Sequence, residues 1–472
     1  MSGYSSRRRG FFYYFKWVVF LSSVACGWYY APHIWLKFHQ IDAEAIISSS
    51  KMKNKKFSGT VQEVKSSEIS AYLLEEHSVP IVSMNFDFTN AGSAHEADEK
   101  QGLTDILTKI LLDGAGRYDA VAFKDICEEY GIKIGFNSGV DEISGYLHFP
   151  KQNMEMALKM LDLVLQKPRF DEEFITLRKQ QLKTAVKMSL ENPQAILADK
   201  FSEFIFAGHP YSRTQAEMLE TIDDIGKQDM IDFMQTHLSR ENLIIGIAGD
   251  VSVEETEDIL QRIFTKLPKK YQGEKMSEIN IEFGGREYNV EKDTAQAMTV
   301  FATKGTYRNS VDFYPLYIAN YVFGGSGLNS RISQIIREKE GLTYGIYTTL
   351  TESDAVAMIQ GSYSATADNF KKARKLLLSE WQKIATQGIT EEELQQAKDS
   401  LISSFNLRFA SISNIASMLT AMQKYKIGRD FLEKRNDYIK TVTLQEVNAA
   451  AKKYFSVTPD FVNIGIKTEE KQ

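Results

Sequence analysis

The sequence predicts an α+β fold made of two similar halves, each a mixed sheet flanked by helices, and three observations support this prediction. From about residue 57 onward, short runs typical of β-strands alternate with long helical patterns. Two pairs of segments recur in the same order at a separation of roughly 217–220 residues, which indicates an internal duplication of units of about 200 residues. A polar stretch separates the two halves.

Residues 1–45 are predicted to be a signal or membrane anchor followed by a linker. Arginines 7–9 precede an almost wholly apolar run over residues 11–31, which is close to the length of about 20 residues that spans a bilayer. Small residues before Cys26 leave cleavage open, whereas aromatic residues at both ends of the run favour a retained anchor. A mitochondrial presequence is a competing interpretation, because the first acidic residue is Asp42. The arginines predict a periplasmic or otherwise extracytoplasmic chain, anchored in the membrane by this segment.

The first half is predicted to span residues 55–264. A strand is expected in VPIVSMNFDF, which begins at Val79, and an amphipathic helix is expected over residues 102–112. Further along, residues 171–190 have the pattern of a helix with an acidic start, and residues 222–250 that of a helix followed by a strand.

The second half is predicted to span residues 281–470. Its residues 390–407 repeat the acidic helical pattern of the first half, and its residues 439–468 repeat the helix followed by a strand. The polar segment 265–280, which contains Pro268, is the predicted linker between the halves.

Composition and simple motifs exclude several classes of protein. Lys+Arg number 56 against 62 Asp+Glu, for a net charge of -6 spread along the chain, which argues against a nucleic-acid binder. The chain has only two cysteines, Cys26 and Cys127, which lie far apart with Cys26 in the apolar N-terminal segment, and this excludes a disulfide framework and a cysteine-based zinc site. No histidines have the spacing of zinc ligands, Walker A and dinucleotide motifs are absent, and Leu328 breaks a Gly-x-Ser-x-Gly motif. We therefore expect neither a metal nor a cofactor in this chain.

Four segments carry a resemblance to a known family. The stretches VPIVSMNFDFTNAGSAHE, QGLTDILTKILLDG and GIKIGFNSGVDEISGYLHF are similar to the opening of the pitrilysin/insulinase zinc metallopeptidases, in the branch that resembles the mitochondrial processing peptidase. In the second half, YVFGGSGLNSRISQIIREKEGLTYGIYTTL resembles that family's Gly-rich turn, helix and Arg/Tyr pair. The resemblance covers roughly residues 60–468 and implies two homologous peptidase-family domains.

The resemblance also implies that the zinc motif has been lost. Members of the family bind zinc through His-x-x-Glu-His and a later glutamate. Here the first motif reads Asp105 to Lys109, with Thr108 in place of the general base, and Ala185 stands at the place of the glutamate. A carboxylate beside an ammonium cannot replace two imidazoles, because the lysine repels a dication and offers no lone pair.

The helical periodicity agrees with this loss. The apolar residues of the helix recur at helical spacing and leave Asp105, Thr108 and Lys109 on the other face. Asp105 and Lys109 form an i,i+4 pair worth about 0.3–0.5 kcal/mol. The face that zinc would need is therefore predicted to be a solvated charge pair.

The resemblance implies functional roles for Arg337 and Tyr344. In similar heterodimeric peptidases one subunit holds zinc, and its partner supplies such a pair to hold the substrate backbone and stabilise the oxyanion. A structural alternative is that Arg337 pairs with Glu338 or Glu340 on a solvated face while Tyr344 is half-buried in a strand. Asn137 matches a substrate-facing asparagine of the family, although an asparagine that forms a turn before Gly139 is the alternative.

Two functions follow from these expectations. The first is a zinc-free, Arg/Tyr-bearing subunit of a heterodimeric zinc endopeptidase, which binds peptide substrate and stabilises the transition state in trans. Its partner would be a homologous subunit with an intact His-x-x-Glu-His motif, and the chain alone would be inactive. The alternative is a non-catalytic structural or binding component built on the same fold.

Overall fold

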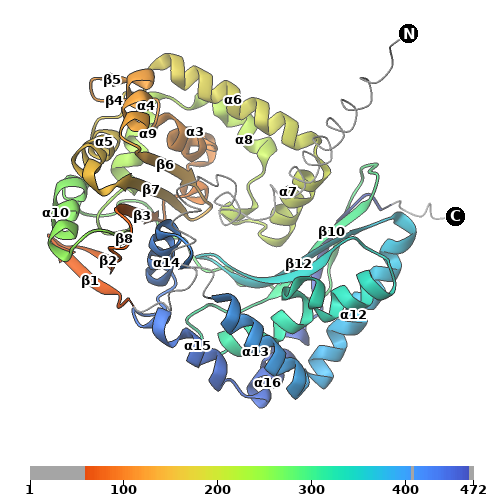
Figure 1. Cartoon of the computed structure of the whole chain (residues 1–472). Helices are drawn as coiled ribbons and strands as arrows, with labels where there is room; N and C mark the ends of the chain where they lie inside the picture. Colours follow the sequence, from red (N-terminus) through yellow and green to blue (C-terminus); the bar gives the residue numbers. More distant parts are fainter. Residues whose placement is uncertain (1–58, 406–408, 467–472) are drawn as a thin grey trace, which may run out of the picture. The chain divides into compact units, whose positions relative to one another are not determined.

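The computed structural model describes residues 59–405 and 409–466, and within them two sheets form the centres of the two halves (Figure 1). The first sheet has six strands in the order β1-β2-β8-β3-β7-β6, namely β1 (Gln62–Ser66), β2 (Ile69–Glu75), β8 (Leu243–Gly249), β3 (Ile81–Thr89), β7 (Glu142–Pro150) and β6 (Lys133–Ser138). The second has five in the order β11-β12-β10-β13-β9, namely β11 (Ile346–Glu352), β12 (Ala357–Ala365), β10 (Ala297–Lys304), β13 (Asp460–Ile464) and β9 (Glu287–Val290).

The two sheets confirm the predicted duplication. The strands β2-β8-β3-β7-β6 of the first sheet correspond one by one to β9-β13-β10-β12-β11 of the second. In each sheet one pair is parallel, β2 with β8 and β9 with β13, and the three other corresponding pairs are antiparallel. The halves thus share strand order and direction, which chance similarity of amphipathic helices would not produce.

Helices cover the first sheet where the sequence predicts them. The expected helix over 102–112 is α3 (Leu103–Ile110), and the one over 171–190 is α6 (Glu172–Glu191). A short hairpin of β4 (Gly114–Ala115) and β5 (Tyr118–Asp119) follows α3. The remaining helices are α4 (Ala120–Glu129), α5 (Met154–Gln166), α7 (Pro193–Ile205), α8 (Gln215–Thr221), α9 (Lys227–His237) and α10 (Val253–Phe264).

The helices of the second half repeat this arrangement. Residues 390–407 were expected to be helical and contain α13 (Glu391–Phe405), while residues 439–468 contain α16 (Leu444–Phe455) followed by β13. A capping box of Thr443 and Glu446 starts α16, where the two side chains satisfy backbone N–H groups. The other helices are α11 (Phe313–Asn320), α12 (Ala367–Gln387), α14 (Ile412–Lys424) and α15 (Phe431–Thr441).

Each half places one helix against the sheet of the other half. Helix α14 of the second half packs on β2, β3 and β8 of the first sheet, beside which Figure 1 shows it. The contact is close, because a Cβ added to Gly246 in β8 would lie 2.5 Å from the carbonyl oxygen of Ala416. Helix α7 of the first half packs on β9, β10 and β13 of the second sheet, where Phe204 stacks on Tyr288 with ring centroids 5.7 Å apart. Each half keeps a hydrophobic core of its own, and a third cluster joins residues of both, among them Leu74 and Ala248 of the first sheet and Leu419 of α14.

The segment between the halves, residues 265–286, contains neither helix nor strand. The domain boundaries predicted above remain predictions, since the described chain from residue 59 onward forms one compact unit. The predicted anchor, residues 11–31, lies outside the described residues. Among the helices that are described, none has the length and apolarity to cross a membrane.

Candidate functional site

Helix α3 carries the three positions of the zinc motif, and its outward face is less solvated than the sequence predicts. The prediction is wrong for Thr108, which is buried because α6 and β6 pack against this face of α3. The Thr108 hydroxyl donates to the carbonyl oxygen of Thr104 at 2.9 Å. Asp105 is half-buried, and desolvation raises the pKa of its carboxyl, while the nearby Lys109 ammonium opposes this rise. Only Lys109 is fully exposed.

These residues do not fit the zinc ion that the resemblance implies. Asp105 supplies one carboxylate, Thr108 uses its hydroxyl within the helix, and Lys109 is a cation. Ala185 lies on α6, the helix that packs beside α3, and its methyl group offers no ligand. Throughout residues 59–405 and 409–466, no group of three His, Cys, Asp or Glu side chains is placed to hold a metal ion. Zinc chemistry at this helix therefore has no set of donors to support it.

A buried carboxyl near the start of α3 escaped the sequence analysis. Glu96 accepts hydrogen bonds from the backbone N–H groups of Gly102, at 2.9 Å, and Thr104, at 2.6 Å, and from the Thr104 hydroxyl at 2.7 Å. Desolvation raises its pKa to about 7 although these bonds favour the carboxylate. Thr104 also lies 2.7 Å, oxygen to oxygen, from Ser138 at the end of β6. Glu96 thus connects the start of α3 to the edge of the first sheet.

Asn137 lies on that edge. It belongs to β6, where it pairs with Ser144 of β7, and β7 is the only strand beside β6 in the described chain. The alternative that Asn137 forms a turn is wrong, because the chain turns after β6 ends, where the N–H of Gly139 donates to the carbonyl of Glu142. The Asn137 side chain is half-buried. Asn137 lies on an edge strand of the first sheet, and this position is compatible with a substrate-facing role. That role stays a prediction.

Arg337 lies in the π-helical segment η8 (Ser333–Lys339). The glycines expected to form an open turn are partly helical, because Gly324 and Gly325 belong to a second π-helical segment, η6 (Tyr321–Gly325). A glycine is required at 324, where a Cβ would lie 2.3 Å from the Thr348 hydroxyl oxygen of β11. The guanidinium of Arg337 is 3.5 Å from the Glu338 carboxylate, and its side chain is 34% exposed. This pair agrees with the structural alternative for Arg337.

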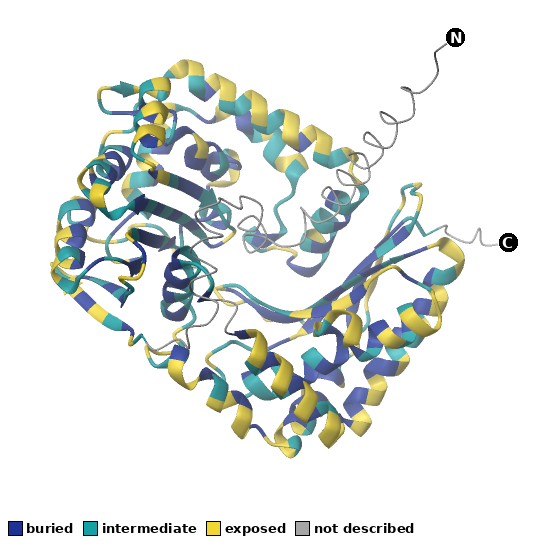
Figure 2. Cartoon of the chain, in the orientation of Figure 1, coloured by how far each residue is buried: buried dark blue, intermediate teal, exposed yellow. Residues whose placement is uncertain are grey.

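Tyr344 does not lie where the structural alternative places it. It lies in the loop between η8 and β11, two residues before the strand begins, and it is 81% exposed. The alternative of a half-buried residue in a strand is therefore wrong. Within the described residues no hydrogen bond joins Tyr344 to Arg337, and their joint role in holding a substrate stays a prediction. In the cartoon of Figure 2, the strands of the second sheet are largely in the dark blue of buried residues, whereas yellow, exposed residues recur along the outer helices of the second half.

The duplicated fold and the ligand positions on α3 define a two-domain peptidase-like protein without the residues of a zinc site. The chain belongs to the insulinase family, peptidase family M16. The insulinase (peptidase family M16) model matches residues 73–218, and the peptidase M16 inactive domain model matches residues 224–401.

Relatives match most of the chain. An uncharacterized zinc protease of Rickettsia felis is 26% identical over 386 residues, which are 80% of this chain and 90% of the relative. The non-peptidase homolog YmxG of Helicobacter pylori is 23% identical over 418 residues, or 87% and 95% of the two chains. A crystal structure of the peptidase M16 inactive domain from Pseudomonas fluorescens has a TM-score of 0.80 at 24% identity, covering 87% of this chain and 99% of its own, and shows the shared fold. The names of these relatives differ on peptidase activity. The side chains at the zinc-ligand positions of α3 are therefore more direct evidence on whether this chain can bind zinc.

Proposed function

We propose that this chain is the zinc-free subunit of a heterodimeric zinc endopeptidase, to which it contributes Arg337 and Tyr344. The observation that carries the proposal is the 81% exposure of Tyr344 in a well-packed domain. A tyrosine that is mostly exposed in its own chain adds little to folding, whereas tyrosines are enriched where proteins meet other molecules. Its phenol is free to donate to a peptide or to a second chain.

The weak ion pair of Arg337 supports the same proposal. Its carboxylate neighbour is adjacent in sequence and 3.5 Å away, and a pair of this kind near the surface is worth about 0–1 kcal/mol. Transferring the guanidinium to a substrate carbonyl therefore costs little. Two such donors, held before charge develops, have the chemistry of an oxyanion site.

The proposal requires a partner, because the residues on α3 cannot hold the metal. We expect a homologous subunit with an intact His-x-x-Glu-His motif, and a peptide or unfolded segment as substrate. The sequence of residues 1–45 favours a complex outside the cytoplasm and attached to the membrane. Asn137 on β6 would contact the same substrate.

A second candidate function is a structural or binding component of the same fold. The pairing of Arg337 with Glu338 favours it, because an arginine that stays in that pair has no role in catalysis. The names non-peptidase homolog and inactive domain, which two similar proteins carry, point the same way.

Purification of the full chain from its native host, followed by identification of bound chains and metal analysis, tests the proposal. The expected result is a stoichiometric partner with His-x-x-Glu-His, about one zinc per heterodimer and peptide hydrolysis by the complex. A stable complex without zinc or hydrolysis would favour the structural component, and recovery of the chain alone would contradict both functions.

A further inference from the structure

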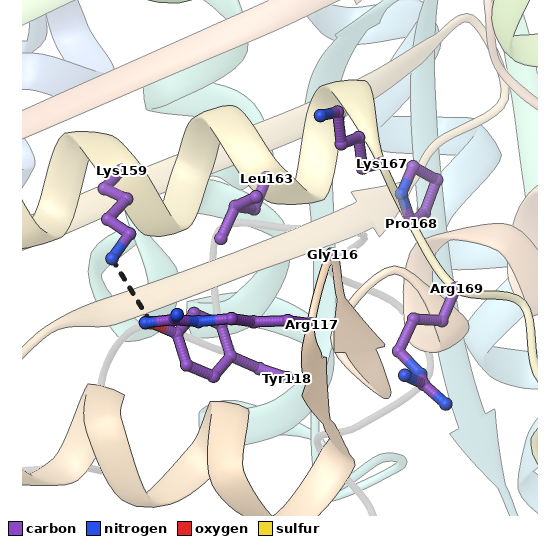
Figure 3. A pocket seen from close by; sticks show the side chains of 8 residues that line it. All are labelled: Gly116, Arg117, Tyr118, Lys159, Leu163, Lys167, Pro168 and Arg169. Atoms are coloured by element: carbon purple, nitrogen blue, oxygen red, sulfur yellow. Dashed lines mark hydrogen bonds between the residues drawn. The ribbon is translucent and has the colours of Figure 1, made fainter.

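A hollow of about 530 Å³ lies in the first half, outside the candidate site (Figure 3). Three segments surround it: the turn of the β4-β5 hairpin, one side of α5, and the connection from α5 to α6. Figure 3 shows cationic side chains from all three segments at this hollow, with Leu163 and Pro168 as its apolar lining. The lining residues are Gly116, Arg117, Tyr118, Lys159, Leu163, Lys167, Pro168 and Arg169.

Backbone contacts fix the hairpin turn against the connection. The N–H of Gly116 donates to the carbonyl of Lys167 at 2.8 Å, and that of Arg169 donates to the carbonyl of Gly114 at 3.3 Å. Gly116 has a φ of 57°, and a Cβ there would lie 2.8 Å from a methyl carbon of Leu163. Only glycine suits this turn, so the position of the neighbouring Arg117 is set by the fold before any ligand binds.

The positive charge at the hollow is poorly compensated. Arg117 and Lys159 both donate to the neutral phenol oxygen of Tyr118, at 2.9 and 3.2 Å. In the described part of the chain, no carboxylate pairs with Arg117, Lys159 or Lys167. Asp119 caps α4 and Asp162 pairs with Lys266, whereas Asp171 pairs with Arg169, the fourth cation of the hollow.

The two cations change the pKa of the Tyr118 phenol. Hydrogen bonds from Arg117 and Lys159 lower the pKa of Tyr118 although the protein as a whole has a net charge of -6. A neutral oxygen is a weak partner for two cations, and an anion that replaced it would form charge-assisted hydrogen bonds with both.

A second hollow of about 520 Å³ adjoins the first, because Lys167 and Pro168 line both. Its other walls are mainly apolar and include Phe170 and Met234. The side-chain nitrogen of Gln166, which also lines it, is buried without a hydrogen-bond partner in the described chain. Leaving a buried donor without a partner is unfavourable, and an acceptor on a ligand would satisfy it.

We propose that the first hollow binds the phosphate group of a small molecule through Arg117, Lys159 and Lys167, and that the second receives its organic part, with an acceptor for Gln166. The proposal is independent of the role of Arg337 and Tyr344. It favours a phosphate ester over inorganic phosphate, because only an ester reaches the apolar walls and the unpartnered amide.

Isothermal titration of the full chain in non-ionic detergent, with pyrophosphate and uridine diphosphate as probes, separates the two sources of phosphate. Both probes should bind with a stoichiometry of one at low salt, and uridine diphosphate should bind more tightly. Arg117→Gln and Lys159→Gln should each weaken both probes about tenfold or more, since each removes a charge-assisted bond. Gln166→Ala should weaken uridine diphosphate alone.

Lys434→Gln is the matched control, because Lys434 is an exposed lysine of the second half that pairs with Asp430. It should bind both probes as the unaltered chain does. Absence of binding at about 1 mM of either probe, or unchanged binding in Arg117→Gln and Lys159→Gln with normal circular dichroism, would overturn the anion site. Equal affinities for the two probes would overturn the assignment of the second hollow.

Discussion

Lys424 at the end of α14 donates to Glu142 at the start of β7, with the nitrogen 2.6 Å from the carboxylate oxygen. The pair joins the second half to the first, and its side chains are only 14% and 18% exposed. Burial is the largest single influence and would lower the pKa of Lys424, but the charge and hydrogen bond of Glu142, together with Tyr425 and Asp141, outweigh it, and the pKa is raised overall. The lysine is therefore a cation that fastens α14 to the sheet of the other half.

Removing one partner of this pair should destabilise the whole protein. We expect Lys424→Met to lower the free energy of unfolding by about 2–4 kcal/mol, because it leaves Glu142 desolvated without a counter-charge. Combining it with Glu142→Gln should recover part of the loss. Denaturant unfolding of the four proteins measures the coupling, with Lys434→Met as an exposed control. Additive effects of the two substitutions would show that the pair contributes nothing.

The isolated chain should bind no stoichiometric zinc and should not hydrolyse peptides. The reason is the side chains of Asp105, Thr108, Lys109 and Ala185 at the ligand positions. Restoring the ligands with Asp105→His, Thr108→Glu, Lys109→His and Ala185→Glu should not restore activity, because position 108 is buried and a metal site also needs neighbours that orient its ligands. Elemental analysis that found about one tightly held zinc per unaltered chain would contradict the prediction.

Tyr344→Phe should leave assembly with a zinc-bearing partner unchanged and slow catalysis. The substitution removes one hydroxyl donor from a side chain that is 81% exposed, so folding does not depend on it. Turnover should fall about 10²-fold or more, equivalent to about 2.7 kcal/mol, with a smaller effect on substrate affinity, because the oxyanion exists only after attack. Steady-state kinetics at matched complex concentration, with assembly followed by size exclusion, gives the answer.

Controls for this experiment are present in the chain. Tyr438→Phe removes a hydroxyl from another exposed tyrosine, on α15, and should leave turnover unchanged. Arg337→Ala should weaken both substrate binding and turnover, since a guanidinium also holds ground-state carbonyls. Normal turnover in Tyr344→Phe with intact assembly would remove the catalytic role and favour the structural component.

Glu96 should make stability depend on pH. Its pKa of about 7 in the folded chain lies above the ordinary 4.5, so its contribution to stability is complete below about pH 4.5 and is lost as the pH rises through about 7. A difference of about 2.5 pKa units corresponds to about 3 kcal/mol. The stability of the unaltered chain relative to Glu96→Gln should therefore decrease from pH 5 to pH 8. Unfolding at several pH values tests this, and exposed Glu257→Gln should show no such trend.

The full chain should sediment with membranes, and a chain that starts near Lys51 should be soluble. The only long apolar run of the sequence covers residues 11–31, and the remainder has the composition of a globular protein. Mass spectrometry of the mature N-terminus distinguishes the alternatives. A first residue at Cys26 or Gly27 would replace the anchor with a cleaved signal.

The sequence predicts the fold well where local patterns carry the information. The recurrence of segments near residues 222–250 and 439–468 shows the duplication, because each unit repeats its own periodicity and turn residues. The exchange of α7 and α14 between halves was not predictable in this way, since an amphipathic helix does not specify which of two similar sheets receives its apolar face.

The candidate site was predicted less completely. Helical periodicity placed Thr108 opposite the apolar face of α3, but it could not show that α6 and β6 cover that face. Glu96 lies six residues before the glycine that starts α3, outside the spacing of a capping box, and no local signal marks it. Arg337 and Tyr344 were found through the resemblance, and their exposure became known only from the structure.

The exchange of α7 and α14 has a consequence for how a substrate would gain access. Because a helix of each half packs on the sheet of the other, separating the halves would disrupt two helix-sheet contacts and the Lys424–Glu142 pair together. Separating the two halves is therefore a costly way to admit a substrate. If this chain encloses a peptide together with a zinc-bearing partner, we expect the peptide to enter at the interface between the two proteins. The rate of substrate entry would then depend on how readily that interface opens.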